Sequence, residues 1–417
     1  MAEFSPADGR ELQEIVAAAL AEERPLEILG AGSKRALGRP VQAADTLSLA
    51  RLSGIVDYQP AELVLTARAG TPLAVIEAAL AERGQMLAFE PPDWGPLLGV
   101  AGGGQTIGGV IAGNFSGPRR PKAGAARDHF LGFAGVSGRG EAFKAGGKVV
   151  KNVTGYDLPK LLAGSWGTLA VLAEVTVKVL PRPEETRSVL IFGLADGPAV
   201  AVMAEALNLP HDVSAAAHLP AALAGRSAVR AVAGSGTAVT ALRIEGPLPS
   251  AEHRAAALRL ALAPHGPNEA LDAAASLALW REIADAAPLM PLSGLRGQSE
   301  DDPAAILWRV SLPPAAAPGF LVRLAAAGLA FVHFFDWGGG LVWLGLAGDA
   351  DCGAASIRAA LAPAGGHSTL IRAPLARRAA LAVFEPPAPA LAALTARVKE
   401  SFDPRRILNP GRMYQGI

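Results

Sequence analysis

Cysteine is nearly absent from this chain of 417 residues, which contains Cys352 and no other thiol. A single thiol cannot build a disulfide framework, a thiolate zinc site or an iron–sulfur cluster. Any iron–sulfur relay that works with this chain must therefore lie on another subunit. Cys352 itself is interpreted as a small residue in an irregular segment rather than as a reactive thiol.

A surplus of charge is also lacking. Lys and Arg together number 38, as do Asp and Glu, so the net charge is zero. Nucleic-acid binding needs a basic surplus, which argues against DNA or RNA as the main partner but leaves room for a local anion site. Half of the residues, 51%, are hydrophobic. The chain is therefore globular and long enough for two or three domains with cores.

Targeting and membrane-spanning signals are not evident. Residues 1–11 carry acids and no apolar core, unlike a signal peptide. The uncharged run 94–118 exceeds the length of a membrane span, but it contains nine glycines together with polar side chains. Such a composition suits loops packed against a ligand. We expect a cytoplasmic protein that reaches a membrane only peripherally, through its partners.

Residues 1–183 alternate between helical and extended patterns, which predicts an α+β domain. An amphipathic helix is expected over 11–23, and a strand over 26–29. Thr71 is predicted to cap a second helix with proline at its first position, and Gly84 to close it. From residue 95 to 180, glycines become dense and strands short.

The character of the sequence changes after a proline-rich linker. Alanine-rich helical stretches alternate with strand-like stretches over residues 184–385, which predicts a separate α+β domain. Residues 386–417 form a third segment, with a final helix predicted over 391–401. No internal sequence repeat is apparent.

Two glycine-rich stretches suggest a bound diphosphate. A diphosphate needs converging backbone N–H donors where no side chain blocks its approach. Gly30–Lys34 follows a strand and adds hydroxyl and ammonium donors, although an ordinary turn is an equal alternative. It lacks the third glycine and later acid of the Rossmann fingerprint, and no Walker triplet occurs. Residues 102–114 carry paired glycines, which indicate a ligand pressed against the backbone.

Basic residues near these turns have two interpretations. Arg119, Arg120 and Lys122 either face a phosphate or form a solvated basic loop. Lys148 and Lys151 either lie near a cofactor ring whose anionic reduced form a cation would stabilise, or lie in water.

Five motifs occur in a characteristic order: Thr106–Gly109, Arg127–His129, Gly155–Leu158, Gly164–Leu169 and Asn409–Gly411. In these motifs the chain resembles the FAD-linked oxidases of the vanillyl-alcohol oxidase/p-cresol methylhydroxylase superfamily. Four finer segments, at 89–92, 114–120, 146–152 and 336–340, are similar to the E-subunit family of bacterial glycolate oxidases.

The resemblance implies an α+β fold in which residues 1–183 form two FAD-binding subdomains and residues 184–385 form an α+β cap domain. The tail would return to the FAD-binding domain. FAD would be non-covalent, because no Cys and no His precedes His129 in this region. The implied cofactor-binding residues are Gly30, Ala31, Gly32, Ser33, Lys34, Gly103, Thr106, Ile107, Gly108, Gly109, Gly113, Asn114, Gly124, Arg127, Asp128, Lys148, Lys151, Asn152, Tyr156, Asp157, Gly167, Thr168, Glu174, Val175, Thr176 and Asn409.

One departure from related 2-hydroxyacid dehydrogenases bears on catalysis. Those enzymes carry a metal-linked cluster, His-x-Gly-Asp-Gly-Asn-x-His together with Glu-His-Gly. Residues 335–343 here contain no histidine pair, and no Glu-His-Gly sequence occurs, so no metal site is predicted. A hydroxyacid needs a base for its hydroxyl proton and a cation for its carboxylate. The remaining candidates are His333, His367 and Arg372, each of which also has a structural interpretation.

The resemblance therefore implies an FAD-containing subunit of a multi-subunit glycolate oxidase, which converts glycolate to glyoxylate. Its partners would be a sister FAD subunit, which takes hydride from the 2-hydroxyacid, and an iron–sulfur subunit. This chain would serve electron transfer or assembly. Two alternatives remain open. One is a stand-alone FAD dehydrogenase of another hydroxyacid, alcohol or lactone that uses His367 or Arg372. The other is a flavin-free structural subunit.

Overall fold

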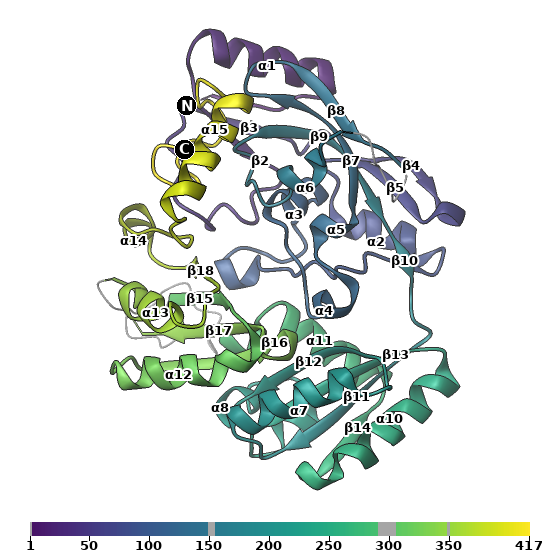
Figure 1. The fold of residues 1–417 in the computed structure, drawn as a ribbon. Coiled ribbons are helices and arrows are strands. Elements are labelled where there is room, and N and C mark those ends of the chain that lie inside the picture. Colours follow the sequence, from purple (N-terminus) through teal and green to yellow (C-terminus); the bar gives the residue numbers. More distant parts are fainter. Residues whose placement is uncertain (1, 149–154, 291–305, 348–350) are drawn as a thin grey trace. The chain divides into compact units, whose positions relative to one another are not determined.

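The computed structural model describes residues 2–148, 155–290, 306–347 and 351–417 (Figure 1). The chain forms two compact units. The first comprises Met1–Ser116, Gly124–Arg182 and Ala382–Ile417, and the second comprises Gly117–Ala123 and Pro183–Leu381. The boundaries expected at residues 183 and 385 therefore need three corrections. Gly117–Ala123 and Pro183 belong to the second unit, and Ala382 to Glu385 belong to the first.

The first unit begins with a small parallel sheet in the order β1-β3-β2, in which helix α1 connects β1 to β2. Their bounds are β1 Glu3–Phe4, α1 Gly9–Ala21, β2 Leu26–Leu29 and β3 Asp45–Ser48. Helix α1 starts two residues earlier than predicted, because Asp8 is its N-cap and accepts hydrogen bonds from the amides of Arg10 and Glu11.

A five-stranded antiparallel sheet, β4-β5-β9-β7-β8, forms the other part of this unit. The strands are β4 Ile55–Gln59, β5 Val64–Arg68, β7 Phe130–Ser137, β8 Ala142–Gly146 and β9 Ala170–Lys178, with a short pair formed by β6 Gln85–Met86 and β10 Leu180–Pro181. The helices are α2 Leu73–Ala81, α3 Ile107–Gly113, α5 Ala126–His129 and α6 Leu158–Leu162.

The predicted cap of α2 is wrong by one residue. The N-cap is Pro72, and the hydroxyl of Thr71 instead donates to the carbonyl of Arg68 at 2.6 Å. Gly84 has the positive φ of 62° that its predicted role requires, but it lies one residue beyond the predicted C′ position, because the C-cap of α2 is Glu82.

The C-terminal tail completes the first unit. Helix α15, Pro389–Phe402, is followed by a segment in which Leu408 pairs in parallel with Leu26 of β2 (Figure 1). Residues at opposite ends of the sequence thus share one small sheet, which agrees with the expectation that the tail returns to this domain.

The second unit is built on an eight-stranded antiparallel sheet in the order β14-β11-β13-β12-β16-β17-β15-β18. Its strands are β11 Glu185–Phe192, β12 Val213–Leu219, β13 Val239–Gly246, β14 Asn268–Leu271, β15 Ile306–Ser311, β16 Phe331–Asp336, β17 Leu341–Leu346 and β18 His367–Arg372. Its described helices are α4 Arg120–Ala123, α7 Asp196–Asn208, α8 Ala221–Ala224, α9 Arg230–Ala233, α10 Leu248–Leu262, α11 Ala273–Ala284, α12 Ala317–Ala326, α13 Ala354–Leu361 and α14 Leu375–Ala380.

This sheet contains a structural repeat that the sequence does not reveal. Apart from the short helices α8 and α9 between β12 and β13, the first half runs β11-α7-β12-β13-α10-β14, and the second half runs β15-α12-β16-β17-α13-β18. Each half is a βαββαβ unit with the same strand order, so the two are copies of one topology. They meet at their equivalent strands β12 and β16, through the pair His218 and Phe335.

Side chains alternate across this sheet. On β13, Thr240 contacts His218 on the face that carries α7, whereas Arg243 and Glu245 point to the opposite face. Segment 117–123 lies on that opposite face, because Arg119 forms an ion pair with Glu245. This contact explains why the segment belongs to the second unit. In the described ranges, no helix is both long and apolar enough to cross a membrane.

Candidate cofactor-binding site

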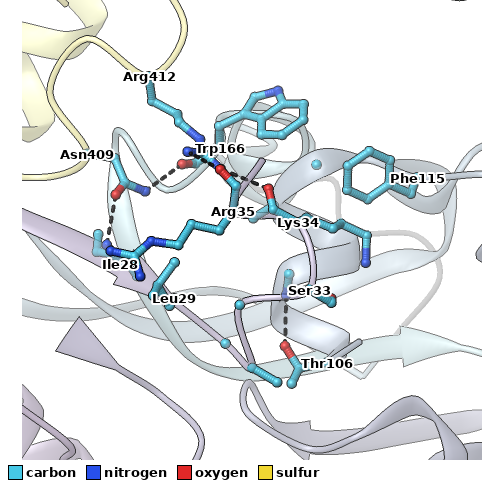
Figure 2. A pocket seen from close by; sticks show the side chains of 16 residues that line it. Ile28, Leu29, Ser33, Lys34, Arg35, Thr106, Phe115, Trp166, Asn409 and Arg412 are labelled. Atoms are coloured by element: carbon cyan, nitrogen blue, oxygen red, sulfur yellow. Dashed lines mark hydrogen bonds between the residues drawn. The ribbon is translucent and has the colours of Figure 1, made fainter. Parts of the chain in front are cut away.

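A groove in the first unit brings together glycine-rich segments that are distant in sequence (Figure 2). It has a cavity volume of about 80 Å³, and an adjoining hollow of about 70 Å³ shares part of its wall. Nine of the residues predicted to bind cofactor line the groove: Gly30, Ala31, Gly32, Ser33, Lys34, Thr106, Gly109, Gly113 and Asn409. Gly108 and Gly167 line the adjoining hollow.

The turn after β2 offers backbone donors to this groove. Gly32 has a φ of 76°, a conformation that favours glycine, and its carbonyl accepts the amide of Arg35 at 3.0 Å. Within the described part of the chain, no hydrogen bond engages the amides of Ala31, Gly32 or Ser33. Adjacent unpaired N–H groups in a turn are suited to an anion such as a diphosphate.

The absence of side chains at two positions lets the segments that line the groove approach one another closely. A Cβ atom at Gly30 would lie 2.2 Å from Oγ1 of Thr106, and one at Gly113 would lie 2.1 Å from the ring of Phe115. Thr106 is the N-cap of α3, and its Oγ1 accepts the amide of Gly109 at 3.4 Å. These close approaches form a cradle that an added Cβ would fill, so the residues fit a dinucleotide cofactor.

Lys34 supplies the cation of the groove. Its ammonium donates to Oε1 of Gln105 at 3.0 Å and lies 5.2 Å from the centre of the Phe115 ring. Burial lowers the pKa of Lys34 to about 8, against an opposing effect of Asp93. The side chain therefore carries its charge at pH 7 and can balance a phosphate.

Asn409 connects two sides of the groove (Figure 2). Its Oδ1 accepts the amide of Ile28 at 2.8 Å, and its Nδ2 donates to the carbonyl of Trp166 at 2.8 Å. Both Asn409 and Trp166 have left-handed backbones, with φ of 44° and 57°. The structure therefore places Asn409 as a link between groove segments as well as part of the lining.

Four further predicted residues form a connected group beside α3. Asn114 ends this helix with a φ of 52°, and its Oδ1 accepts the amide of Arg127 at 2.9 Å. The carboxylate of Asp128 accepts the amide of Ala125 at 2.8 Å, and a Cβ at Gly124 would lie 3.1 Å from that carboxylate. These contacts fix the turn that follows the groove wall.

Other predicted residues neighbour lining residues in the sequence but do not themselves line either hollow. Ile107 is buried at the start of α3. Thr168 offers its carbonyl to Lys399 at 2.6 Å. Glu174, Val175 and Thr176 lie on β9, two residues beyond Leu172, which lines the adjoining hollow.

A last group of predicted residues lies outside both hollows. Gly103 donates its amide to Asp93. Lys148 forms a 2.6 Å ion pair with Asp57 of β4, on an edge strand. Tyr156 is 91% exposed, and Asp157 is the N-cap of α6. Lys151 and Asn152 lie outside the described residues.

The basic segment after the groove wall has partners in the second unit. Arg119 pairs with Glu245, and Lys122 pairs with Asp212. Burial would raise the pKa of Glu245, but Arg243 and Arg119 lower it to about 2. Arg120 lies 4.2 Å from the ring of Trp337. The two interpretations of this segment, phosphate contact and a solvated loop, both missed these anchoring contacts.

The three catalytic candidates do not converge. His333 on β16 is separated from β18 by β17 and β15, which is roughly 14 Å at the usual strand spacing. His367 and Arg372 are the two ends of β18, roughly 17 Å apart along an extended strand. His367 is exposed, Arg372 is buried, and His333 forms a 3.0 Å hydrogen bond with Asp196. Their catalytic role stays a prediction.

The described residues contain no group of three or more His, Cys, Asp or Glu arranged to hold a metal ion. The chain has one Glu-His dipeptide, Glu252 and His253. It lies on α10, is followed by arginine rather than glycine, and its glutamate pairs with Arg187 at 2.9 Å. It is therefore a surface feature of the helix.

Sequence reasoning missed several groove residues, among them Phe115, Trp166 and Arg412. Phe115 lies edge-on to Trp166, with ring centres 5.5 Å apart. A signal for Trp166 was present, since an aromatic residue between Gly164 and Gly167 is surrounded by positions that favour positive φ. Arg412 carried no local signal, because its partners are more than 370 residues away.

Comparisons with known proteins agree with this geometry. Residues 2–146 match the FAD binding domain family. The glycolate oxidase subunit GlcE of Escherichia coli (strain K12) is 35% identical over 403 residues, covering 97% of this chain and 96% of that protein. The glycolate oxidase subunit GlcD of Bacillus subtilis (strain 168) is 30% identical over 188 residues, covering 45% of this chain and 38% of that protein.

A solved structure shows the same fold. The 4-ethylphenol oxidase from Gulosibacter chungangensis superposes with a TM-score of 0.70 at 16% identity, covering 99% of this chain and 89% of that chain. This likeness concerns the fold alone and confirms the predicted α+β architecture of the FAD-binding type. The cofactor is FAD, and the chain belongs to the family of FAD-linked oxidoreductases that includes glycolate oxidase subunit GlcE.

Proposed function

We propose that this chain is an accessory FAD subunit of a multi-subunit glycolate oxidase, which oxidises glycolate to glyoxylate. The observation that carries this proposal is an asymmetry between the two units. The first unit holds a formed cofactor groove, whereas the candidate base and cations of the second unit are spread over separate strands. The geometry therefore supports flavin binding, but it does not bring the candidate catalytic residues together into a site for a hydroxyacid.

When bound, FAD supplies a carrier for two electrons. The residues of this chain bind and orient it. The amides of Ala31–Ser33 and the ammonium of Lys34 are proposed to face the diphosphate, while Thr106 and Asn409 hold the walls. No His or Cys is among the described residues that line the groove, which supports non-covalent binding, so acid precipitation of the protein should release the flavin.

The proposed partners follow from the family and from the single cysteine. A sister FAD subunit would take hydride from the 2-hydroxyacid. An iron–sulfur subunit would carry electrons onward, because this chain cannot hold such a cluster. The complex is proposed to be cytoplasmic, with any membrane contact made through these partners.

The test is an absorbance spectrum of the purified chain, followed by anaerobic addition of glycolate. We expect a flavin band that stays oxidised with the isolated chain and bleaches when the two partner subunits are added. Rapid bleaching of the isolated chain would overturn the accessory role and support a stand-alone dehydrogenase. A preparation that rejects added FAD would overturn flavin binding itself.

A further inference from the structure

We propose that the C-terminal tail is a clasp for the cofactor groove, in which Asn409 and Arg412 position the two groove turns and Lys399 anchors the tail. FAD retention would then depend on residues far from the glycine motifs. This inference rests on the FAD binding of the proposed function, and it adds positioning residues that do not themselves need to touch the cofactor.

The first step of the argument is the double contact of Asn409. Its side chain accepts from Ile28, just before the turn Gly30–Lys34, and donates to Trp166 at 2.8 Å in each case. A Cβ at Gly167 would lie 2.8 Å from Nδ2 of Asn409, so the amide group fits closely under this second turn. One side chain thus fixes the separation of two segments that line the groove.

Arg412, which also lines the groove, supports the first turn through hydrogen bonds to its backbone (Figure 2). Its guanidinium donates to the carbonyls of Lys34 at 3.0 Å and Arg35 at 3.3 Å. Its own carbonyl accepts the amide of Arg39 at 3.0 Å. These bonds hold carbonyls of the turn towards the tail. We infer that they help to keep the amides of Ala31–Ser33 directed towards the groove.

Lys399 anchors the tail to the second turn. Its ammonium is fully buried and donates to the carbonyls of Thr168 at 2.6 Å and Leu408 at 3.1 Å, and to Asp403 at 2.6 Å. Asp403 in turn accepts the amides of Ile407 and Leu408. The network joins α15, the turn near Thr168 and the residue that precedes Asn409.

These contacts have a common consequence. A ligand held by backbone donors needs those donors in place before it arrives, because reorganising them on binding lowers affinity. The tail supplies that organisation by bonding to both turns. Loosening it should weaken FAD binding even when the unit remains folded.

The test compares two conservative variants with one control. Asn409→Asp keeps the acceptor for Ile28 and tolerates the left-handed backbone, but loses the donor to Trp166. Arg412→Lys replaces two guanidinium donors by one ammonium group. The control is Arg405→Met, in the same tail, whose 3.2 Å ion pair with Glu23 is exposed on both sides. For each apoprotein, the dissociation constant for FAD is measured by titration, together with Tm in the absence of FAD.

We expect Asn409→Asp to raise the FAD dissociation constant at least about tenfold, and Arg412→Lys about threefold, with Arg405→Met within about twofold of the parent. Folded variants that bind FAD with the parent's dissociation constant, whatever their Tm, would overturn the clasp while leaving the proposed function intact. If Asn409→Asp does not fold, the FAD dissociation constant of Arg412→Lys alone tests the clasp, because Arg412 donates directly to backbone carbonyls of the first turn. A parent chain that rejects FAD would overturn both proposals.

Discussion

Asp196 and His333 form a 3.0 Å hydrogen bond that joins the two halves of the eight-stranded sheet. Asp196 opens α7 in the first βαββαβ half, and His333 lies on β16 in the second. His218 of β12 approaches the same carboxylate at 3.6 Å and is held by Thr240 at 2.9 Å. Polar contacts therefore join the two halves of the repeat where β12 meets β16, on the face that carries α7.

This link predicts a pH-dependent contribution to stability. Burial alone would raise the pKa of Asp196, but His218 and His333 lower it well below its ordinary value. A lowered carboxyl pKa stabilises the folded state above the unfolded pKa, about 3.9, and that contribution is lost as the pH falls towards the folded pKa.

We expect Asp196→Asn to lower the free energy of unfolding by about 1 kcal/mol at pH 7, a modest value because the carboxylate is partly exposed. The difference in the free energy of unfolding between this variant and the parent should become smaller below pH 4. Urea unfolding followed across this range gives the comparison. Asp212→Asn, which removes an exposed ion pair with Lys122, serves as the control and should change little. An equal loss at pH 7 and pH 3 would contradict the assignment.

Lys34 predicts a second pH effect, on cofactor affinity. Its pKa of about 8 means that the ammonium loses its proton as the pH rises through 8. If the ammonium faces the diphosphate, FAD affinity should fall between pH 7 and pH 9, because attraction to the phosphates is lost. Lys34→Met should weaken binding about tenfold at pH 7 and flatten the pH profile. Lys160→Met, at an exposed ion pair with Asp157, should keep the parent's profile.

The close contact of Gly30 with Thr106 predicts a steric effect. Gly30→Ala would place a Cβ 2.2 Å from Oγ1 of Thr106, so the turn must shift away from α3. We expect this variant to lose bound flavin during purification, as measured by the ratio of absorbance at 450 nm to that at 280 nm. Gly9→Ala meets no atom within 4 Å and should purify with the parent's flavin content.

The buried ion pair of Lys399 and Asp403 predicts a large loss of stability. Lys399→Met leaves Asp403 as an uncompensated buried charge, and such changes cost about 3–5 kcal/mol. Arg397→Met, on an exposed part of the same helix, should cost less than about 0.5 kcal/mol. Thermal unfolding of both variants checks the contrast. A small effect of Lys399→Met would mean that the pair is not the anchor inferred for the tail.

The cofactor groove was predictable where backbone conformation demands a particular residue. Gly30, Gly32 and Gly113 are needed for close approach or positive φ, so their pattern in the sequence carried the information. The hydroxyl of Thr106 and the cation of Lys34 followed from their positions beside these glycines. The helix starts were off by one or two residues, because Asp8 and Pro72 cap them in ways that a local pattern does not distinguish.

Contacts between distant segments were not predictable in the same way. Arg412 and Trp166 join the groove through partners far along the chain, and a single sequence holds no record of such pairs. The repeat in the second unit escaped notice because it conserves topology, which many sequences satisfy, rather than particular residues. Segment 117–123 was assigned to the wrong unit for a related reason, since its anchors Glu245 and Trp337 follow more than 120 residues later.

The division of the first unit into three stretches of sequence bears on how the protein is made. The bond between Ile28 and Asn409 spans 381 residues, so the groove cannot be completed on the ribosome until Asn409 has been synthesised. The second unit, by contrast, draws nearly all of its residues from one continuous stretch. Biosynthesis should therefore deliver a folded second unit first, and the flavin should enter only after Asn409 has been synthesised.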